Sequence, residues 1–585
     1  MDLAHILKMF LGLSLFLYGM NLMGAALERR AGKQLKMILS KLAANPFKGF
    51  LLGTAVTAIV QSSCATTVMV VGFVNSGIMD LYQSVGIILG ANVGTSATAW
   101  LLSLSNIQGT SVITSIFSTS TFVPILAVIG IVMLMFAKKE RKKDTAGILL
   151  GFSVLMFGMS TMSDAVKPLS EMKAFTDLLT MFSNPFLGLI VGTLFTAVIQ
   201  SSSASTGIIQ ALSMTGAIRM STVFPLLFGF NIGTCITAII SSSGASADAK
   251  RASMIHLIFN VLCAVIGMPL FYLVDHFAHF AFLDAVANPV SIAILHSTIK
   301  IICSLIALPF PNQFIRLSRL IVRGKKEAEN ELVLDERLFV TPAIAIDRAR
   351  SATIDMAQTA AESYMRAISL LDHFSEEGAE KVSEYEDLGD KYEDVLGTFL
   401  VKLGEQQLTA DDSHEQTELL HMIGDLERIT DHADNLAESA RELFEKKLHF
   451  SDEALEELTI LAGAVGEAVR LSMDAFIGDD LHSAARVEPL EQVVDSLQKQ
   501  VRARHIDRLT RGVCSIEHGF VLNDILANLE RISDHCSNIA GCVIETHLRS
   551  MDMHSYLGEV KSGSDKDFND MFDSFTDKYA LPARD

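Results

Sequence analysis

Two short polar strings, QSSCATT at 61–67 and QSSSAST at 200–206, interrupt long apolar stretches of the sequence. The first lies within GFLLGTAVTAIVQSSCATTVMVVGFV and the second within GLIVGTLFTAVIQSSSASTGIIQAL. Neither string carries a charge, and each breaks a stretch that is otherwise apolar enough for a membrane. Gln, Ser and Thr at such a break can satisfy the backbone groups that lipid leaves unpaired, or they can bind a ligand.

The two strings belong to a duplicated unit. Residues 45–100 align without a gap with residues 184–239 at an offset of 139, and 20 of the 56 positions are identical. Both copies share an Asn-Pro-Phe start, the Gln-Ser-Ser triplet and an Asn-x-Gly-Thr string, found in GANVGT and GFNIGT. A repeat of this length predicts two structural copies of one membrane unit.

The charges divide the chain into a membrane half and a soluble half. Residues 1–330 carry 23 Lys and Arg against 13 Asp and Glu, whereas residues 331–585 carry 24 against 53. A chain of 585 residues that is 50% hydrophobic, with a mean hydropathy of +0.37, is too apolar for a soluble protein. The acidic second half argues against nucleic acid as a partner. The seven cysteines lack paired spacing, so a reducing cytoplasm suits this half.

The apolar stretches predict an all-α fold, with a polytopic membrane domain of two inverted repeats with re-entrant hairpins and then a soluble helical bundle. The expected spans are 5–27, 82–104, 114–137, 145–165, 221–242, 252–275 and 288–310. The expected domains are 1–315 for membrane transport (repeat one about 5–137, repeat two about 145–275, final span 288–310), 316–344 for a cytoplasmic linker, 345–548 for the bundle and 549–585 for a polar, disordered tail.

Basic loops predict the orientation of the membrane half. Lys and Arg cluster at 29–48, in KKERKK (138–143) and in RLSRLIVRGKK (316–326). All three clusters are cytoplasmic only if each QSS segment enters and leaves the bilayer on the same side. The N-terminus is then outside, the C-terminal domain is cytoplasmic, and the second repeat is upside down relative to the first. The two hairpin tips are expected to meet at the bilayer midplane.

Two tips that meet could form one central binding site. Broken-helix N-termini attract anions, and carbonyl and hydroxyl oxygens suit Na⁺. The alternative is that these small polar residues serve only to pack helices together. Two motifs at matched positions of the repeat favour a binding site over this alternative. A catalytic serine has no neighbouring His or acid as its base. The candidate ligands are Gln61, Ser62, Ser63, Thr66, Thr67, Asn92, Thr95, Gln200, Ser201, Ser202, Ser203, Ser205, Thr206, Asn231 and Thr234.

The doubled QSS motif, together with GANVGT and GFNIGT, resembles the bacterial sodium-dependent phosphate cotransporter family over most of residues 1–310. The resemblance implies a multi-pass transporter of the bacterial plasma membrane, not an enzyme, with Na⁺ as coupling ion and inorganic phosphate as substrate. Some members carry an acid after the first hairpin that makes transport electrogenic. Residues 81–136 contain none, so the stoichiometry stays open, as does assembly into a homodimer.

Lys300 and His296, in the string HSTIK, are ionisable residues within the last expected span. His256 and Asn260, in HLIFN, repeat their spacing. Ionisable groups inside a membrane are candidate functional residues. The alternative, that Lys300 pairs within the helix bundle or reaches an edge of the bilayer, is slightly favoured by the sequence, so Lys300 is not counted among the candidate ligands.

The acidic half also contains a repeat, because DLERITDHADNLAE (425–438) matches NLERISDHCSNIAG (528–541) at an offset of 103. Apolar residues at helical spacing predict about six helices in two three-helix units. The string resembles PhoU, the helical regulator of bacterial phosphate uptake, and implies a metal cluster; a solvated helix face is the alternative. The candidate metal ligands are the i, i+4 acids Glu386, Asp390, Glu427, Asp431, Glu491, Asp495, Glu530 and Asp534.

Two functions therefore follow from the sequence. The first is a Na⁺-coupled phosphate transporter with a PhoU-like regulatory domain. The second is a membrane-anchored phosphate-signalling regulator or scaffold without transport activity. The polar hairpins favour the first, since an anchor needs no hydroxyl groups at the midplane.

Overall fold

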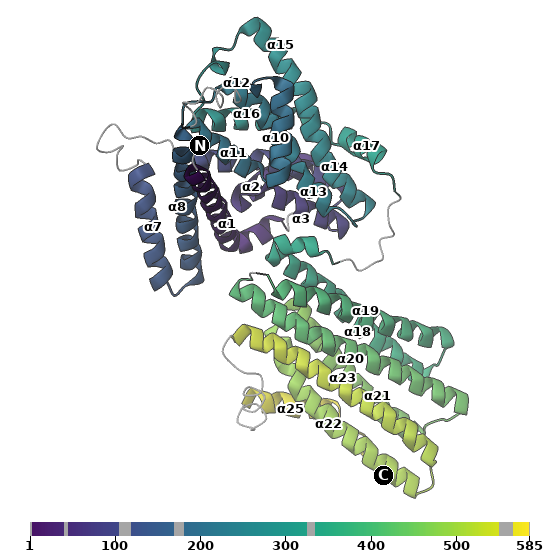
Figure 1. Ribbon diagram of the computed structural model, residues 1–585. Helices are drawn as coiled ribbons and strands as arrows, with labels where there is room; N and C mark the ends of the chain where they lie inside the picture. The colour runs from purple at the N-terminus through teal and green to yellow at the C-terminus, as the bar shows by residue number, and fades with distance from the viewer. Residues whose placement is uncertain are drawn as a thin grey trace. The chain divides into compact units, whose positions relative to one another are not determined.

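The computed structural model describes residues 3–39, 45–104, 119–168, 181–324, 334–406, 408–548 and 566–583. These residues form helices and connecting turns, with one isolated β-bridge between Arg219 and Val286, which confirms the all-α prediction for this part of the chain. The chain divides into two compact units, Met1–Ala343 and Ile344–Asp585 (Figure 1).

The first unit consists of apolar helices, several of them short (Figure 1). Their bounds are α1 Leu3–Leu39, α2 Pro46–Val60, α3 Ser63–Asn75, α4 Leu81–Gly94, α5 Ser96–Ser103, α7 Thr119–Phe136, α8 Glu140–Val166, α10 Pro185–Ile199, α11 Ser202–Ser213, α12 Met220–Gly233, α13 Cys235–Ser241, α14 Ala247–Leu262, η3 Cys263–Gly267, α15 Met268–Ala278, η4 Ala281–Leu283, α16 Pro289–Ala307, α17 Pro311–Ile321 and η5 Glu336–Val340.

Six helical segments of the described residues are long and apolar enough to cross a membrane, and the bent pair α10–α11 could add a seventh. The six are Ala4–Leu27, Leu81–Ser103, Arg141–Val166, Met220–Ser241, Ala247–Ala278 and Pro289–Ala307. Each overlaps a predicted span. The predicted span 114–137 corresponds to α7, of which the structure describes Thr119 onward.

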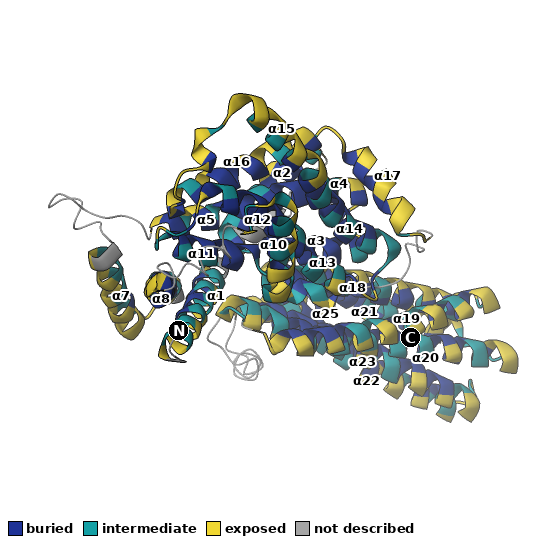
Figure 2. Ribbon diagram, turned by 45° about the horizontal axis from the view of Figure 1, so that its top comes forward, coloured by how far each residue is buried: buried dark blue, intermediate teal, exposed yellow. Residues whose placement is uncertain are grey.

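Large apolar side chains on the outside of this unit have no protein cover. Met135 and Phe136 of α7 are 72% and 77% exposed, and Val198 of α10 is 83% exposed. Figure 2 shows such exposed positions along α7 and α15. In water these surfaces would be costly, whereas in a bilayer they face lipid tails.

Glycines allow the helices of the first unit to approach closely. A Cβ atom at Gly90 of α4 would lie 2.0 Å from the carbonyl oxygen of Phe50 in α2. A Cβ atom at Gly229 of α12 would lie 2.4 Å from the carbonyl oxygen of Leu189 in α10. Backbone contact through small residues is typical of membrane helices. Gly90 and Gly229 are equivalent positions of the repeat, so both copies pack their first hairpin leg in the same way.

The second unit is a bundle of long amphipathic helices (Figure 1). Their bounds are α18 Pro342–Asp372, α19 Glu376–Gly404, α20 Ala410–Lys446, α21 Asp452–Gly478, α22 Leu481–Thr510, α23 Ile516–Leu548 and α25 Lys566–Lys578. Leu, Ala, Val and Ile at helical spacing fill its core. Helices α18 to α23 match the six helices that the sequence predicts.

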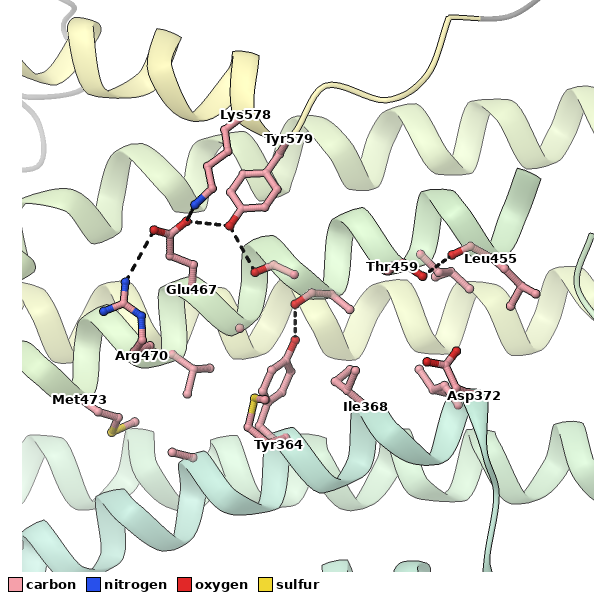
Figure 3. A pocket seen from close by; sticks show the side chains of 18 of the residues that line it. Tyr364, Ile368, Asp372, Leu455, Thr459, Glu467, Arg470, Met473, Lys578 and Tyr579 are labelled. Atoms are coloured by element: carbon pink, nitrogen blue, oxygen red, sulfur yellow. Dashed lines mark hydrogen bonds and ion pairs between the residues drawn. The ribbon is translucent and has the colours of Figure 1, made fainter. Parts of the chain in front are cut away.

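Helix α25 corrects the prediction of a disordered tail for the residues that it covers. Phe568 and Phe575 are 7% and 5% exposed, and α25 packs against α22. The Lys578 Nζ and the Tyr579 hydroxyl lie 2.7 and 2.6 Å from Glu467 Oε2 (Figure 3). The Phe568 and Phe575 rings are seven residues apart and therefore lie on one face of the helix. Burial of this face against the bundle stabilises a helix in a segment that is otherwise polar.

A pocket of about 800 Å³ lies beside this attachment, between α18 and α21 (Figure 3). Ile368 and Met473 contribute to its apolar lining, and the Tyr364 hydroxyl donates a hydrogen bond to the carbonyl oxygen of Ala462 at 2.7 Å. Lys578 and Tyr579 also line the pocket, so the end of α25 forms part of its wall.

Candidate functional site

Each QSS string forms a helix break with the same backbone geometry. Helices α2 and α10 end at Gln61 and Gln200, which adopt left-handed φ, ψ values of 60°, 17° and 60°, 19°. Non-glycine residues adopt this conformation rarely, because the Cβ atom approaches the backbone. Its occurrence at two equivalent positions indicates that the surrounding contacts hold both breaks in one shape.

Hydroxyl groups support both breaks from within. The Ser62 Oγ accepts a hydrogen bond from the Ala65 N–H at 3.1 Å, and the Ser201 Oγ accepts one from the Ala204 N–H at 3.2 Å. These bonds cap the N-termini of α3 and α11. In addition, the Thr57 hydroxyl donates to Thr66 Oγ1 at 2.9 Å, as Thr196 does to Ser205 Oγ at 2.7 Å. Each pair joins the two legs of one hairpin.

The second break turns the chain back. The axes of α10 and α11 differ by 119°, and the helices contain 15 and 12 residues. At about 1.5 Å per residue these legs are roughly 20 Å long, too short for either to cross a bilayer alone. A bend above 90° directs α11 towards the side from which α10 came, as a re-entrant hairpin requires.

The two helix breaks, which are the tips of the predicted hairpins, touch. The Cys64 Sγ, in the first turn of α3, donates a hydrogen bond to the carbonyl oxygen of Gln200 at 3.3 Å. The Gln61 side chain is fixed in turn, because its Oε1 accepts a hydrogen bond from the Thr98 hydroxyl of α5 at 3.0 Å. Two strings that are 139 residues apart in sequence therefore meet at their helix breaks.

Most of the predicted ligands are buried in this region. Ser62 and Ser201 are half-buried, and Gln200 is exposed. The buried ones are Gln61, Ser63, Thr66, Thr67, Asn92, Thr95, Ser202, Ser203, Ser205, Thr206, Asn231 and Thr234. The hydroxyl groups of Thr95 and Thr234 bond to carbonyl oxygens of their own helices, at 3.0 and 2.8 Å.

The two copies differ in how their polar side chains are satisfied. In the first, the Thr67 hydroxyl donates to the Ser63 carbonyl oxygen, and the Asn92 amide donates to that of Ile88. In the second, the equivalent Thr206 Oγ1 and Asn231 Oδ1 are buried and have no hydrogen-bond partner among the described residues. Buried polar atoms are rarely left unpaired, so these two oxygens are candidates for binding a ligand.

Besides Cys64, three threonines contact the predicted ligands and are absent from the predicted set. Thr57 and Thr196 bond to Thr66 and Ser205, and Thr98 bonds to Gln61. Thr57 matches Thr196 in the repeat, and Thr98 matches Thr237. Identity between the two copies is therefore the signal that could have identified them.

The segment just before α18 is fixed to the second leg of the first hairpin. Asp335 accepts a hydrogen bond from the Asn75 amide, at the end of α3, at 2.8 Å. Leu338 of η5 is fully buried, and a Cβ atom at Gly72 of α3 would lie 3.2 Å from it. The Arg337 guanidinium donates to the carbonyl oxygen of Ser243 at 2.9 Å, in the turn after α13. The predicted linker thus contains an anchor on the first unit.

Acidic side chains of neighbouring helices face one another in the second unit. Burial, and then the carboxylates of Asp390 and Asp434, raise the pKa of Glu386. Burial, and then the carboxylate of Asp534, likewise raise the pKa of Glu530. Smaller raising effects come from Asp431 of α20 on Glu386 and from Asp495 of α22 on Glu530. The predicted acids of α19 and α20, and those of α22 and α23, therefore lie within electrostatic range across each helix pair.

The predicted metal cluster nevertheless lacks support. Within the described ranges, no three His, Cys, Asp or Glu side chains come together as a group that could hold a metal ion. Arginines lie among the carboxylates instead, with Arg428 Nε 3.5 Å from Glu427 and Arg531 Nε 3.8 Å from Glu530. These guanidinium groups offset part of the negative charge that would attract a metal, so we assign no metal to Glu386, Asp390, Glu427, Asp431, Glu491, Asp495, Glu530 or Asp534.

A buried acid in α20 predicts how pH affects the second unit. Glu418 is 8% exposed, and burial raises its pKa to about 7, against the lowering effects of Arg350 and Thr546. A raised pKa means that the folded protein holds the proton more tightly than the unfolded chain does. The Glu418 carboxylate therefore lowers the free energy of unfolding once the pH exceeds its unfolded pKa, and it does so most strongly above about pH 7.

Glu418→Gln is therefore expected to raise the free energy of unfolding by about 3 kcal/mol at about pH 8, and by under about 1 kcal/mol at about pH 5. Hydrogen exchange of α20 peptides in the full chain measures this difference. Glu415→Gln is the matched control, since Glu415 lies 3.7 Å from Arg350 and is a quarter exposed. Equal gains for Glu418→Gln at both pH values would contradict the prediction.

Comparison with known proteins identifies both units. The Na⁺/Pi-cotransporter family model matches residues 15–164 and 154–285, and the PhoU domain model matches residues 353–440 and 458–543. The chain is 24% identical over 551 residues to YjbB of Escherichia coli (strain K12), provisionally named an inorganic phosphate export protein; the match covers 93% of this chain and 98% of that one.

Two further proteins match parts of the chain. The sodium-dependent phosphate transport protein 2A of Oryctolagus cuniculus is 33% identical over 106 residues, which are 18% of this chain and 16% of that protein. The crystal structure of PhoU from Pseudomonas aeruginosa aligns with a TM-score of 0.33 at 25% identity, over 35% of this chain and 97% of that one. The apolar helices and the family models together indicate a multi-pass membrane protein of a transporter family. The first unit therefore carries a Na⁺/Pi-cotransporter domain, and the second unit carries two PhoU domains.

Proposed function

We propose that the protein is a secondary active transporter that couples Na⁺ to the movement of inorganic phosphate across a bacterial plasma membrane by alternating access. The second unit regulates it from the cytoplasm. The observation that carries the proposal is the contact between the two hairpin tips, where the Cys64 Sγ bonds to the Gln200 carbonyl oxygen at 3.3 Å. The two QSS strings then contribute to one site rather than to two.

Phosphate suits a place where two helix N-termini meet. Helices α3 and α11 both begin at the tips, directly after the capping residues Ser62 and Ser201. The first N–H groups of a helix have no carbonyl partner within it, and the helix dipole adds a partial positive charge there. Phosphate is bound in this way at helix N-termini in many proteins.

Na⁺ suits the oxygens of the same region. Helices α2 and α10 end at the tips, so carbonyl oxygens of their last turns lie near the N-termini of α3 and α11. Hydroxyl and amide oxygens add to these, among them Thr206 Oγ1 and Asn231 Oδ1, which have no hydrogen-bond partner in the part of the chain that the structure describes. Oxygen ligands of this kind coordinate Na⁺ in transporters built from broken helices. Binding both ions together offsets much of their charge.

Inverted repeats give such a site its alternating access. In the proposed topology the N-terminus is outside, the first hairpin opens to the cytoplasm and the second opens to the exterior. Rocking one repeat against the other then exposes the shared site to one side at a time. A coupled carrier runs in either direction, according to its gradients, so the same machinery can serve the export for which YjbB is provisionally named.

The segment from Asp335 to Thr341, which anchors the chain to the first unit, offers a route for regulation. Helix α18 follows it directly, and the anchor bonds to Asn75 and to Met69, both in α3. A change in the second unit that pulls on this segment would act on a leg of the first hairpin. The PhoU-like domain can limit flux in this way without touching the site.

Transport is tested with the purified protein reconstituted into liposomes. A trace of labelled phosphate is added to the external buffer. We expect an inward Na⁺ gradient to raise the initial rate of phosphate uptake by at least about tenfold over an equal K⁺ gradient, because a coupled carrier draws its driving force from Na⁺. Empty liposomes give the baseline. If neither an inward nor an outward Na⁺ gradient stimulated phosphate movement, the result would instead favour a phosphate-signalling scaffold without transport.

A further inference from the structure

Lys300 is a buried basic residue of the first unit. It lies in α16 and is 4% exposed, although its side chain is one of the longest and most strongly hydrated. No carboxylate forms an ion pair with Lys300 within the described ranges, and no hydrogen bond joins its ammonium to another described residue. An unpaired charge in a membrane interior is costly, and it marks a functional site by default.

Helix α16 places this ammonium between the two repeats. It packs against α4 and α5 of the first copy and against α11 and α12 of the second. The Trp100 indole N–H of α5 donates to the Ser297 hydroxyl at 3.0 Å, and the Gln210 amide of α11 donates to the Pro289 carbonyl oxygen at 2.8 Å. The Ser304 hydroxyl donates to the Leu89 carbonyl oxygen of α4 at 3.2 Å. The position of Lys300 along α16 is fixed from both sides.

The ionisable groups that act electrostatically on the ammonium lie at the hairpin tips and beside them. Lys300 is within electrostatic range of Cys64, whose Sγ bonds to Gln200, and of Cys235, which follows the Asn-x-Gly-Thr string of the second copy. His296, one turn earlier in α16, is 2% exposed, and neither of its ring nitrogens has a hydrogen-bond partner in the described region. Lys300 thus lies within electrostatic range of the contact between the two tips, and the unpartnered His296 ring lies one turn away from it in α16.

We propose that Lys300 is a phosphate-binding residue, whose ammonium supplies the positive charge of the site that the two tips form. This inference rests on the proposed function and adds to it, since every QSS residue is neutral. Helix N-termini offer partial charges, whereas a phosphate dianion is best matched by a full one. The energetic cost of the unpaired lysine in the empty carrier is then offset when phosphate binds.

Lys300→Met, which keeps the length and removes the charge, separates this role from a structural one. We expect the phosphate concentration for half-maximal uptake to rise by at least about tenfold, because a charge-assisted hydrogen bond is lost. We also expect the phosphate-free variant to melt at a higher temperature than the wild type, because an unpaired buried charge is gone. Inorganic phosphate should raise the melting temperature of the wild type and not that of the variant.

Lys300→Arg is expected to retain part of the phosphate affinity, and Lys250→Met is the matched control, as Lys250 lies half-exposed in the first turn of α14. A lower melting temperature of phosphate-free Lys300→Met, or an unchanged phosphate dependence of its uptake, would overturn the inference while leaving transport by the wild type intact. Absence of Na⁺-stimulated uptake in the wild type would overturn the proposed function itself, and the two failures are thereby distinguished.

Discussion

Replacing Ser62 or Ser201 by alanine is expected to lower Na⁺-driven phosphate uptake by at least about tenfold. Each serine caps a helix N-terminus at a hairpin tip, through a hydrogen bond of 3.1 Å to Ala65 N or 3.2 Å to Ala204 N. Without the cap, the first turn loses its fixed position, and the N–H groups proposed to hold phosphate lose theirs with it. Initial uptake rates in liposomes measure the effect.

Asn45→Ala is the matched control for Ser62→Ala. Asn45 caps the other end of the same hairpin, where its Oδ1 accepts a hydrogen bond from the Phe47 N–H at 2.8 Å. The loss of either cap is expected to cost about 1 kcal/mol of stability, but only Ser62 lies at the tip. If Asn45→Ala reduced uptake as strongly as Ser62→Ala, the loss would reflect general destabilisation and the site at the tips would be wrong.

Gly90→Ala is expected to destabilise the first unit by about 1–3 kcal/mol and to abolish most of the uptake. The added methyl group would lie 2.0 Å from the Phe50 carbonyl oxygen and 2.8 Å from the Thr54 N. Both are backbone atoms, so a side-chain rotation cannot relieve the overlap. Helix α2 must move away from α4, and the tip of the first hairpin moves with it. The melting temperature and the uptake rate of the purified variant measure the two effects.

Gly24→Ala provides the comparison for Gly90→Ala. Its added methyl group would meet nothing closer than the Val60 carbonyl oxygen at 3.7 Å, an ordinary contact. Alanine is a better helix former than glycine by about 1 kcal/mol, so this variant is expected to be as stable as the wild type or more so. Equal melting temperatures for the two variants would show that α2 and α4 do not need their close approach.

The sequence predicted the helix breaks because two independent signals agree there. Polar residues interrupt apolar stretches, and they do so at equivalent positions of a repeat; the structure places the breaks at Gln61 and Gln200. The sequence could not predict that the copies differ. Gln61 is 7% exposed and bonds to Thr98, whereas Gln200 is exposed and its carbonyl oxygen meets Cys64. The first contact lies within one copy and the second joins the two copies, and a linear pattern contains neither.

For the acidic half, the metal prediction lacks support and the prediction of a disordered tail is wrong for α25, in both cases for physical reasons that a linear pattern does not contain. The i, i+4 acids do face a neighbouring helix, but Arg428 and Arg531 lie among them, and three-dimensional distances decide whether a metal site forms. The tail was predicted to be disordered from its polar composition. Phe568 and Phe575 are nevertheless enough to hold α25 against the bundle, with Glu467 binding its end.

The number of phosphate ions that one chain binds tests the central claim most directly. Titration calorimetry of the purified protein with inorganic phosphate in NaCl gives that number for the wild type, Ser62→Ala and Ser201→Ala. Because the two tips are proposed to form a single site, we expect one phosphate per chain in the wild type and a severe loss of binding when either hairpin is changed. Two phosphates per chain, with one retained after each substitution, would contradict it.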